Sequence, residues 1–314
     1  SSENQFFACY NGFIYSKDYT ELILIYNKVE GEIILHENLL KIRKKTFSKK
    51  TLITSIKLGS NIETIGSKSF QSCIKLKSIT IPNKVKIIKE NTFKNCISLM
   101  SINLPNNLQK IKSCAFYYCI NLMSISIPNS IRNINSYTFY NCKSLRSINL
   151  PDNLQRIDYY AFYGCSSLSS ITLPDSLTKI DHCAFEQCTN LTSITIGKNL
   201  RKIDQLSFIM CKKITSISIH ENNTNFKFFN GILYNHDFAE MIIIPLLNGN
   251  VILHENLGEI CSYSFCEQKN ITSIIIGEKV GYIGERAFSG CQKLKSVTFG
   301  TKNKLVINNF AFES

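Results

Sequence analysis

Hydrophobic residues recur along this chain at fixed positions of a 23-residue period, which predicts one structural unit stacked on copies of itself. Phenylalanine marks the period most clearly, because every gap between eight successive phenylalanines is 23 residues. These residues are Phe47, Phe70, Phe93, Phe116, Phe139, Phe162, Phe185 and Phe208. The spacing resumes after an interruption with Phe265 and Phe288, and Phe312 follows with one residue added.

One unit shows how a coil should form. The segment Leu99-x-x-Ile102-x-Leu104-x-x-Asn107 has the spacing of a leucine-rich repeat. Its apolar residues alternate with Ser101 and Asn103, which predicts a short strand with one buried face. Strands of successive coils should pair in a parallel sheet, about 4.8 Å apart. The segment 111–119 should return the chain as a short helix or 3-10 turn that packs Phe116 inward.

We therefore predict an α/β leucine-rich-repeat solenoid. It should carry a parallel β-sheet on one face, short helices or 3-10 turns on the other, and two β-hairpin insertions.

Cysteine occupies a second fixed slot, three residues after the repeat phenylalanine. A file of buried thiols inside the solenoid is the structural interpretation, because a cysteine thiol behaves as a small hydrophobe with a weak donor. Cysteine pairs elsewhere, such as Cys114 and Cys119, lack the C-x-x-C spacing, which argues against zinc and redox roles. The slot holds Cys73, Cys96, Cys119, Cys142, Cys165, Cys188, Cys211 and Cys291.

The interruption resembles the start of the chain. Asn11-Gly12-Phe13-Ile14-Tyr15 matches Asn230-Gly231-Ile232-Leu233-Tyr234, and each copy places two apolar runs around a polar turn, a β-hairpin pattern. We predict a hairpin cap at 1–32, repeats at 33–222, an inserted hairpin at 223–250, and repeats at 251–314 that are truncated at the C-terminus.

Three His-Glu-Asn triplets invite a metalloprotease interpretation. They begin at His36, His220 and His254, but each lacks the second histidine of H-E-x-x-H. All three fall in the turn slot after a repeat strand, so we interpret them as turns.

The motif I-x-x-I-x-x-x-x-F-x-x-C-x-x-L-x-S-I-x-[IL]-P resembles the BspA-type leucine-rich repeat. The unit from Leu108 to Pro128 fits it, with leucine replacing the first isoleucine. The resemblance spans nearly the whole chain, except that Lys50 and Gln268 replace the slot cysteine. It implies a surface protein that binds host matrix proteins and mediates adhesion, with no shared catalytic residues.

Lys and Arg residues together outnumber Asp and Glu by 13, so the net charge is strongly positive. This charge either favours acidic partners such as anionic glycans or only keeps a large surface soluble. A basic cluster could bind sulfated glycans, or its members could simply be surface lysines and arginine. It consists of Lys41, Arg43, Lys44, Lys45, Lys49 and Lys50. Nucleic acid is not an expected partner, since no zinc spacing, phosphate loop or base-reading helix is evident. No apolar run reaches about 20 residues, so membrane attachment would need an anchor outside these residues.

The first candidate binding surface is the outward strand face. Its uncharged side chains could hydrogen-bond a long repetitive ligand, or merely pair across strands. The positions that we single out are Ser101, Asn103, Ser124, Ser126, Ser147 and Asn149.

The second candidate is a tyrosine cluster. Tyr117, Tyr140 and Tyr163 share the slot after the repeat phenylalanine, with Tyr137 and Tyr160 nearby in the frame. Tyrosine is enriched at interfaces, although packing between coils would also explain the cluster.

We expect no catalytic centre, cofactor or metal site, because no nucleophile–base pair is evident. The favoured hypothesis is a cell-surface or secreted module that binds extracellular matrix proteins, host surface proteins or anionic glycans. The alternative is a cytoplasmic protein–protein scaffold. Sequons at Asn190, Asn222 and Asn270 favour secretion only faintly.

Overall fold

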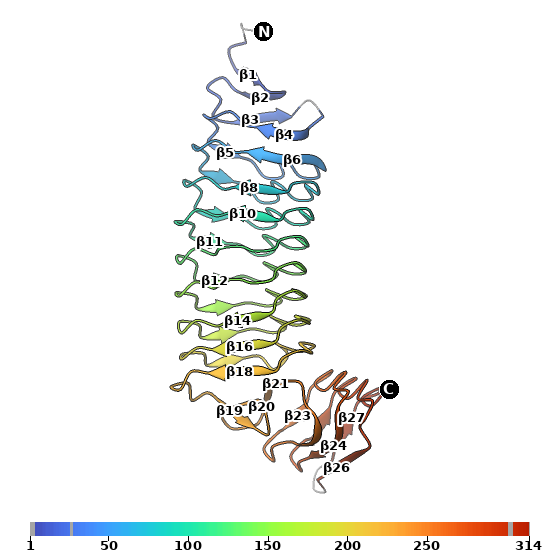
Figure 1. Ribbon diagram of the computed structural model, residues 1–314. Helices are drawn as coiled ribbons and strands as arrows, with labels where there is room; N and C mark the ends of the chain where they lie inside the picture. Colours follow the sequence, from blue (N-terminus) through green and yellow to red (C-terminus); the bar gives the residue numbers. More distant parts are fainter. Residues whose placement is uncertain (1–3, 26–27, 301–303, 314) are drawn as a thin grey trace. The chain divides into compact units, whose positions relative to one another are not determined.

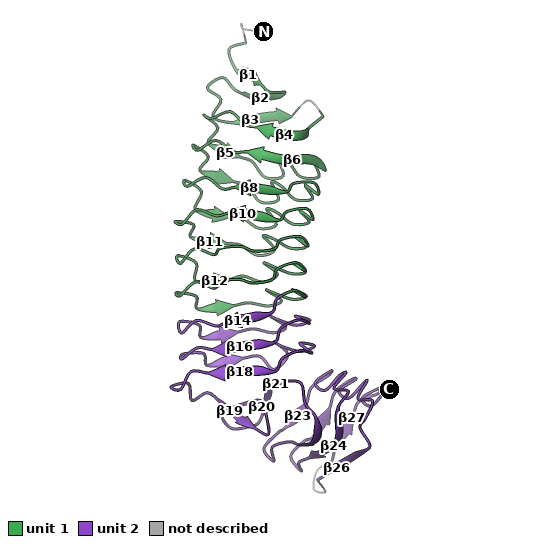
Figure 2. Ribbon diagram, in the orientation of Figure 1, with its two compact units in different colours: residues 1–167 green, residues 168–314 purple. Residues whose placement is uncertain are grey.

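The computed structural model describes residues 4–25, 28–300 and 304–313. The chain divides into two compact units, 1–167 and 168–314 (Figure 2). Parts of the predicted segments 1–32 and 251–314 lie outside the described residues, and the bounds of the four predicted segments stay predictions.

Unit 1 begins with an antiparallel sheet of order β1-β2-β3 and continues as stacked coils (Figure 1). Strands on one side of the coils pair in the order β10-β8-β6-β4, and short strands elsewhere pair as β5-β7, β9-β11 and β12-β13. The strands of unit 1 are β1 Phe7–Tyr10, β2 Phe13–Ser16, β3 Leu22–Ile25, β4 Glu30–Ile34, β5 Lys41–Ile42, β6 Leu52–Lys57, β7 Thr64–Ile65, β8 Ser78–Thr80, β9 Ile87–Ile88, β10 Ser101–Asn103, β11 Lys110–Ile111, β12 Asn133–Ile134 and β13 Arg156–Ile157.

The 23-residue period sets the register of the parallel pairs. Ser101 lies beside Ser78, and Ile102 lies beside Ile79, each 23 residues earlier. Within β10, Ile102 is buried while its two neighbours are exposed. The predicted parallel sheet and its alternation are therefore confirmed in this coil.

A column of phenylalanine rings fills the interior of unit 1. Each ring from Phe47 to Phe162 stacks on the next with centroids 5.2 to 5.6 Å apart. Each of these rings is at most 1% exposed. Because a single coil would leave both faces of its ring in water, this column ties the stability of each coil to its neighbours.

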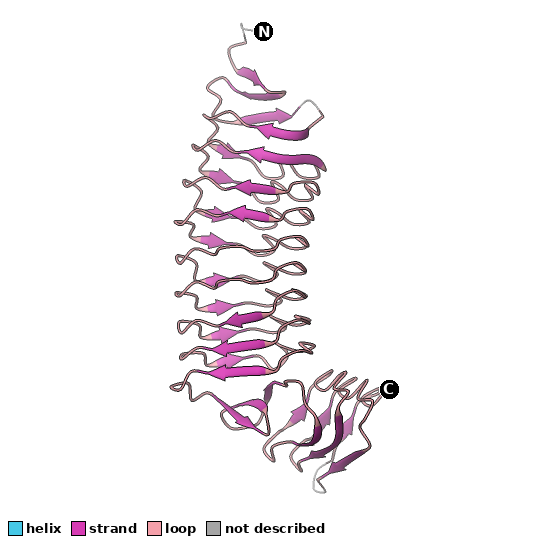
Figure 3. Cartoon of the chain, in the orientation of Figure 1, coloured by secondary structure: helices cyan, strands magenta, loops and turns pink. Residues whose placement is uncertain are grey.

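The predicted helices are wrong: turns and short strands, with no helix, make up the described residues (Figure 3). In the segment 111–119, Cys114 and Tyr118 adopt φ of 58° and 59°, which a right-handed helix does not allow. The N–H of Phe116 donates to the carbonyl of Thr138 in the next coil, 3.0 Å away, instead of to its own turn. Successive β-turns, tied to the next coil, thus replace helical bonding.

The slot cysteines serve this inter-coil bonding. The thiol of Cys119 donates to the carbonyl oxygen of Phe93 over 3.2 Å, and Cys142 does the same to Phe116 over 3.3 Å. All thirteen cysteines are thiols. Cysteine therefore suits the slot, because it supplies a small apolar side chain with one donor.

Unit 2 contains coils of the same kind, interrupted by an antiparallel sheet of order β19-β20-β21. Parallel sheets of order β14-β16-β18, β22-β24-β26 and β23-β25-β27 form its coils, and β15 pairs with β17. Its strands are β14 Ser170–Thr172, β15 Lys179–Ile180, β16 Ser193–Ile196, β17 Lys202–Ile203, β18 Ser216–Ile219, β19 Phe226–Phe229, β20 Ile232–Asn235, β21 Met241–Ile243, β22 Gly249–Ile252, β23 Glu259–Ile260, β24 Ile271–Ile276, β25 Tyr282–Ile283, β26 Ser296–Phe299 and β27 Val306–Ile307.

The two three-stranded antiparallel sheets are built alike. In each, a buried tyrosine hydroxyl accepts the backbone N–H of a histidine at 3.4 Å: Tyr15 from His36, and Tyr234 from His254. The histidine rings stack on Tyr19 and Phe238, each with centroids 4.0 Å apart. The sequence duplication is thus a duplication of one structural module, defined here as the hairpin module, residues 7–25 and 226–244.

Candidate functional site

The tyrosine cluster lies on the turn segments of three successive coils of unit 1. These turns require left-handed backbone two residues before and two residues after the repeat phenylalanine. Tyr118, Tyr137 and Tyr160 occupy such positions, with φ of 59°, 60° and 54°. Bulky side chains seldom adopt this conformation, so the inter-coil bonds at both ends of each turn must hold it.

The slot after the phenylalanine forms a ladder of three parallel rings. Tyr117 and Tyr140 stack with centroids 4.8 Å apart and planes 7° apart, and Tyr140 and Tyr163 stack at 4.6 Å and 6°. All three side chains are half-buried. The rings cover one another's faces, so the surface presents their edges.

A second, shorter ladder runs beside the first. Tyr137 and Tyr160 stack with centroids 5.2 Å apart. Each also contacts a ring of the first ladder, Tyr137 with Tyr140 and Tyr160 with Tyr163, both at 5.7 Å. The structure therefore brings together all five tyrosines singled out from the sequence, and adds Tyr118, which is 37% exposed and lies 4.9 Å from Tyr117.

A cation lies at one end of the first ladder. The Lys94 ammonium sits 4.4 Å from the centroid of the Tyr117 ring, within cation–π range. Burial raises the pKa of the Tyr117 hydroxyl, and the neighbouring Tyr118 raises it further. The Tyr117 phenol thus stays protonated at neutral pH, and its hydroxyl can both donate and accept a hydrogen bond.

The second candidate, the strand face, is flat and polar. Ser101 and Asn103 are exposed on β10, and the Asn103 amide donates to the Thr80 hydroxyl over 3.3 Å. In the following coils the same segments make only an isolated parallel bridge between Ser126 and Asn149. Ser124 and Ser147 are exposed there as well. The predicted strand face is thus present, but its cross-strand pairing is weaker in the tyrosine coils.

Sequence reasoning missed a groove of about 580 Å³ on the strand side of unit 1. Strands β4, β6 and β8 line it with Glu32, Ser55 and Ser78, and Lys57 and Thr80 stand beside them. The sequence does carry a signal for this groove. Glu32 and Lys57 occupy outward strand positions that hold uncharged residues in the later coils.

The His-Glu-Asn triplets are turns, as predicted. The Asn38 N–H donates to Nδ1 of His36 over 3.2 Å, and Asn256 donates to His254 over 3.1 Å. Among the described residues, no group of three or more His, Cys, Asp or Glu side chains is placed to hold a metal ion. In that same part of the chain, no helix has the length and apolar character that a bilayer crossing requires.

Comparison with known protein families shows which family this chain belongs to. The family described as the BspA type leucine rich repeat region (6 copies) matches residues 26–145, 109–238 and 247–314. The chain belongs to the BspA-type leucine-rich-repeat family. BspA-type repeats are a protein-interaction fold, so the exposed surfaces above are candidate contact surfaces.

Solved structures have a similar fold. A leucine rich cell surface protein of Faecalibacterium prausnitzii is 21% identical over 96% of this chain and 79% of its own, with a TM-score of 0.69. The pneumococcal vaccine antigen PcpA is 18% identical over 96% of this chain and 71% of its own, with a TM-score of 0.53. A search of curated proteins gives no match.

Proposed function

We propose that this chain is a cell-surface or secreted adhesion module that binds host proteins or anionic glycans, and that the tyrosine cluster is its main contact surface. The cluster consists of Tyr117, Tyr118, Tyr137, Tyr140, Tyr160 and Tyr163. The proposal rests on the family's interaction fold, and on the surface location named for the similar protein of Faecalibacterium prausnitzii.

The observation that carries the proposal is the gathering of six tyrosines on one turn surface, with ladder spacings of 4.6 to 5.2 Å. Tyrosine provides a large contact area with little loss of side-chain entropy, and stacking here has already fixed the rings. A partner would therefore bind a preorganised surface. The strand face offers serine and asparagine, which seldom dominate binding energy.

The repeat itself supplies a mild substitution for testing. The ladder slot holds Gln71 in an earlier coil, half-buried like the tyrosines. Changing Tyr117, Tyr140 and Tyr163 together to Gln should thus preserve the coils while removing the ladder.

The experiment is a panel of host matrix proteins and a glycan array, probed with the full chain. We expect a protein or anionic glycan to bind, and the triple Gln variant to lose about tenfold or more in affinity. Tyr282→Gln, a change at a tyrosine of unit 2 that is 36% exposed, is the matched control and should bind normally. Absence of binding across both panels, or equal binding by the triple variant, would contradict the proposal.

The thirteen cysteines form no disulfide among themselves, which favours a second candidate, an intracellular protein–protein scaffold. Thiols persist in reducing compartments, whereas secreted proteins more often carry disulfides. Cell fractionation and surface labelling of the native protein separate the two. Recovery only from the cytoplasm would replace the adhesion proposal with the scaffold.

A further inference from the structure

The groove on the strand side of unit 1 carries two opposite charges on one face of its sheet. Glu32 of β4 and Lys57 of β6 both line it, and both side chains are exposed. Glu32 pairs with Ser55, and Lys57 follows Ser55 by two residues. The next pair in the register, Ile33 and Ile56, is buried, so the charged side chains lie together on the outer face. Regular strand geometry places the Cα atoms of Glu32 and Lys57 about 8 Å apart.

No other side chain among the described residues neutralises these two charges. Within that part of the chain, neither Glu32 nor Lys57 makes an ion pair or a side-chain hydrogen bond. Glu30, on the same strand as Glu32, does pair, since its carboxylate lies 2.8 Å from the Lys28 ammonium. The carboxylate of Glu32 and the ammonium of Lys57 are therefore available to a charged ligand.

The equivalent strands of unit 2 lack these charges. Asn250 of β22 and Ile275 of β24 take the positions of Glu32 and Lys57, 218 residues later. There the Asn250 side-chain oxygen accepts the Ser273 hydroxyl over 2.7 Å, so the polar groups of this strand face satisfy each other. Since the second copy forms the same parallel pair without the charges, coil stacking does not require them.

Each charge has a hydroxyl beside it in the groove. Ser55 neighbours Glu32 across the pair of strands, and Thr80 of β8 lies 23 residues after Lys57, in the next coil. The Thr80 hydroxyl accepts the Asn103 amide over 3.3 Å, so its own proton can be donated elsewhere. An ammonium group fits between Glu32 and Ser55. A carboxylate fits between Lys57 and Thr80, where both contacts are charge-assisted hydrogen bonds.

The remaining lining of the groove is largely apolar. Leu58, Ile81 and Pro82 contribute to it, and the latter two are buried. The volume of about 580 Å³ falls within the range of about 300–1,000 Å³ that small-molecule sites occupy. The groove therefore suits a short hydrocarbon segment with an opposite charge at each end.

The strands that line the groove lie inside the stack. β10 continues the sheet beyond β8 (Figure 1). On the other side, the Asn11 amide of the first hairpin module donates to the Ile34 carbonyl of β4 over 3.3 Å. The groove is therefore a feature of the face of the sheet, with chain of unit 1 on both sides of it.

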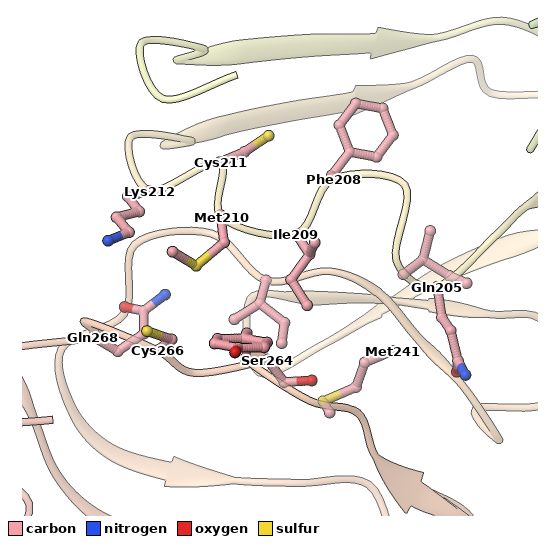
Figure 4. Close-up of a pocket in the computed structure, with 13 residues that line it drawn as sticks. Gln205, Phe208, Ile209, Met210, Cys211, Lys212, Met241, Ser264, Cys266 and Gln268 are labelled. Atoms are coloured by element: carbon pink, nitrogen blue, oxygen red, sulfur yellow. The ribbon is translucent and has the colours of Figure 1, made fainter. Parts of the chain in front are cut away.

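The hollow beside Phe208 in unit 2 has a different lining. The side chains of Met210, Met241 and Cys266 lie around it (Figure 4). Among its described lining residues, Lys212 alone carries a charge. A pair of opposite charges thus distinguishes the groove of unit 1 from this hollow as well as from the equivalent strands of unit 2.

We propose that this groove binds a small zwitterion, a molecule with an ammonium group and a carboxylate group at the two ends of a short chain. Glu32 and Ser55 hold the ammonium group. Lys57 and Thr80 hold the carboxylate. The site is separate from the adhesion surface, because no residue of the tyrosine cluster takes part in it.

The test is calorimetric titration of the full chain with unbranched amino acids of increasing length, from glycine through β-alanine and aminobutyrate to aminohexanoate. We expect the affinity to peak at one chain length, because only one separation of the charges meets both Glu32 and Lys57. An amine and a carboxylic acid of that same length, each with a single charge, should bind about fivefold or more weakly.

Two substitutions for this test come from the second copy of the module. Glu32→Asn and Lys57→Ile each remove one charge, and each should weaken binding of the best amino acid by about fivefold or more. Glu37→Gln is the matched control, because Glu37 lines a neighbouring hollow beside Lys57 and not the groove. This control should bind as the wild-type chain does.

A charge exchange tests the pairing directly. The double variant Glu32→Lys and Lys57→Glu keeps both charges and both hydroxyls but reverses their order. It should bind the amino acid in the opposite orientation, and more tightly than either single variant does.

Three results would overturn the proposal. One is a wild-type chain that shows no saturable binding of any amino acid in the series. Another is equal affinity for the amino acid and for the singly charged compounds of its length. The third is wild-type affinity in both single variants, with their fold verified by circular dichroism.

Discussion

The thiol of Cys96 donates a hydrogen bond to the carbonyl oxygen of Phe70, in the preceding coil, over 3.0 Å. Cys96 is fully buried, and burial raises its pKa well above the ordinary value of a thiol. Alkylation requires the thiolate, so this cysteine should be inert in the folded protein.

We therefore predict that iodoacetamide at about pH 8 modifies the exposed Cys9 and spares Cys96. Peptide mass spectrometry of a time course measures both rates, and a urea-unfolded sample, in which both should react, is the control. Alkylation of Cys96 as fast as Cys9 would contradict the buried column.

The same burial predicts a loss of stability at alkaline pH. Burial raises the pKa of Cys73 from 9.0 to about 12, and raises those of Cys96 and Cys142 as well. Thiols of the unfolded chain ionise near pH 9 while the folded ones stay neutral, so ionisation favours the unfolded state. The contribution is fully retained below pH 9.0 and is lost as pH rises towards about 12.

Thermal unfolding followed from about pH 8 to about pH 11 measures this loss. A variant with Cys73, Cys96 and Cys142 changed to Ala should be less stable than wild type at the lowest pH. Its melting temperature should nevertheless fall less steeply as the pH rises. Identical slopes for the two proteins would mean that the thiols do not carry the effect.

Removing a ring from the phenylalanine column should be severe. Phe116 is fully buried, with stacking partners 5.6 and 5.5 Å away on its two sides. We predict that Phe116→Ala lowers the free energy of unfolding by about 3–5 kcal/mol, through lost burial and the cavity left behind. Urea unfolding measures it. Phe228→Ala, at a 46% exposed ring, should change stability by less than about 1 kcal/mol.

Two glycines of one coil should respond differently to alanine. A Cβ on Gly284 would lie 2.3 Å from the backbone nitrogen of Ser262, whereas one on Gly281 would meet nothing within 4 Å. Gly284→Ala should therefore destabilise by about 1–3 kcal/mol, since the backbone of the neighbouring coil must shift. Gly281→Ala should be neutral or slightly stabilising. Equal melting temperatures for both variants would show that the coils are not so closely spaced.

Much of the fold was predictable because the 23-residue period places equivalent residues in register. Phe93 and Phe116 stack, and Tyr117 and Tyr140 stack, for this one reason. The helix prediction failed because the turn needs positive φ two residues before and two residues after the repeat phenylalanine. Cys114 and Tyr137 do not signal this conformation, but Asn95, Asn141 and Gly164 at equivalent positions of other coils do.

The grooves could not be predicted from the period. The pocket beside Phe208 exists because the interruption folds back against the last coil, a contact between segments with no shared repeat position. The replacement of the slot cysteine by Gln268 does have a local reason. The Gln268 side-chain amide donates to the Pro245 carbonyl over 2.8 Å and accepts from the Leu247 N–H over 3.0 Å. Both partners belong to the insertion, which stands where a regular coil would otherwise precede Gln268.

The central claim is that partners bind the tyrosine cluster rather than the strand face, and one binding measurement separates them. The dissociation constant of the partner found by the panels would be measured for two triple variants in parallel. One changes Tyr117, Tyr140 and Tyr163 to Gln, and the other changes Ser101, Ser124 and Ser147 to Asp. The account predicts a loss of about tenfold or more for the tyrosine variant and wild-type affinity for the serine variant. Wild-type affinity for the tyrosine variant, with a loss for the serine variant, would contradict it.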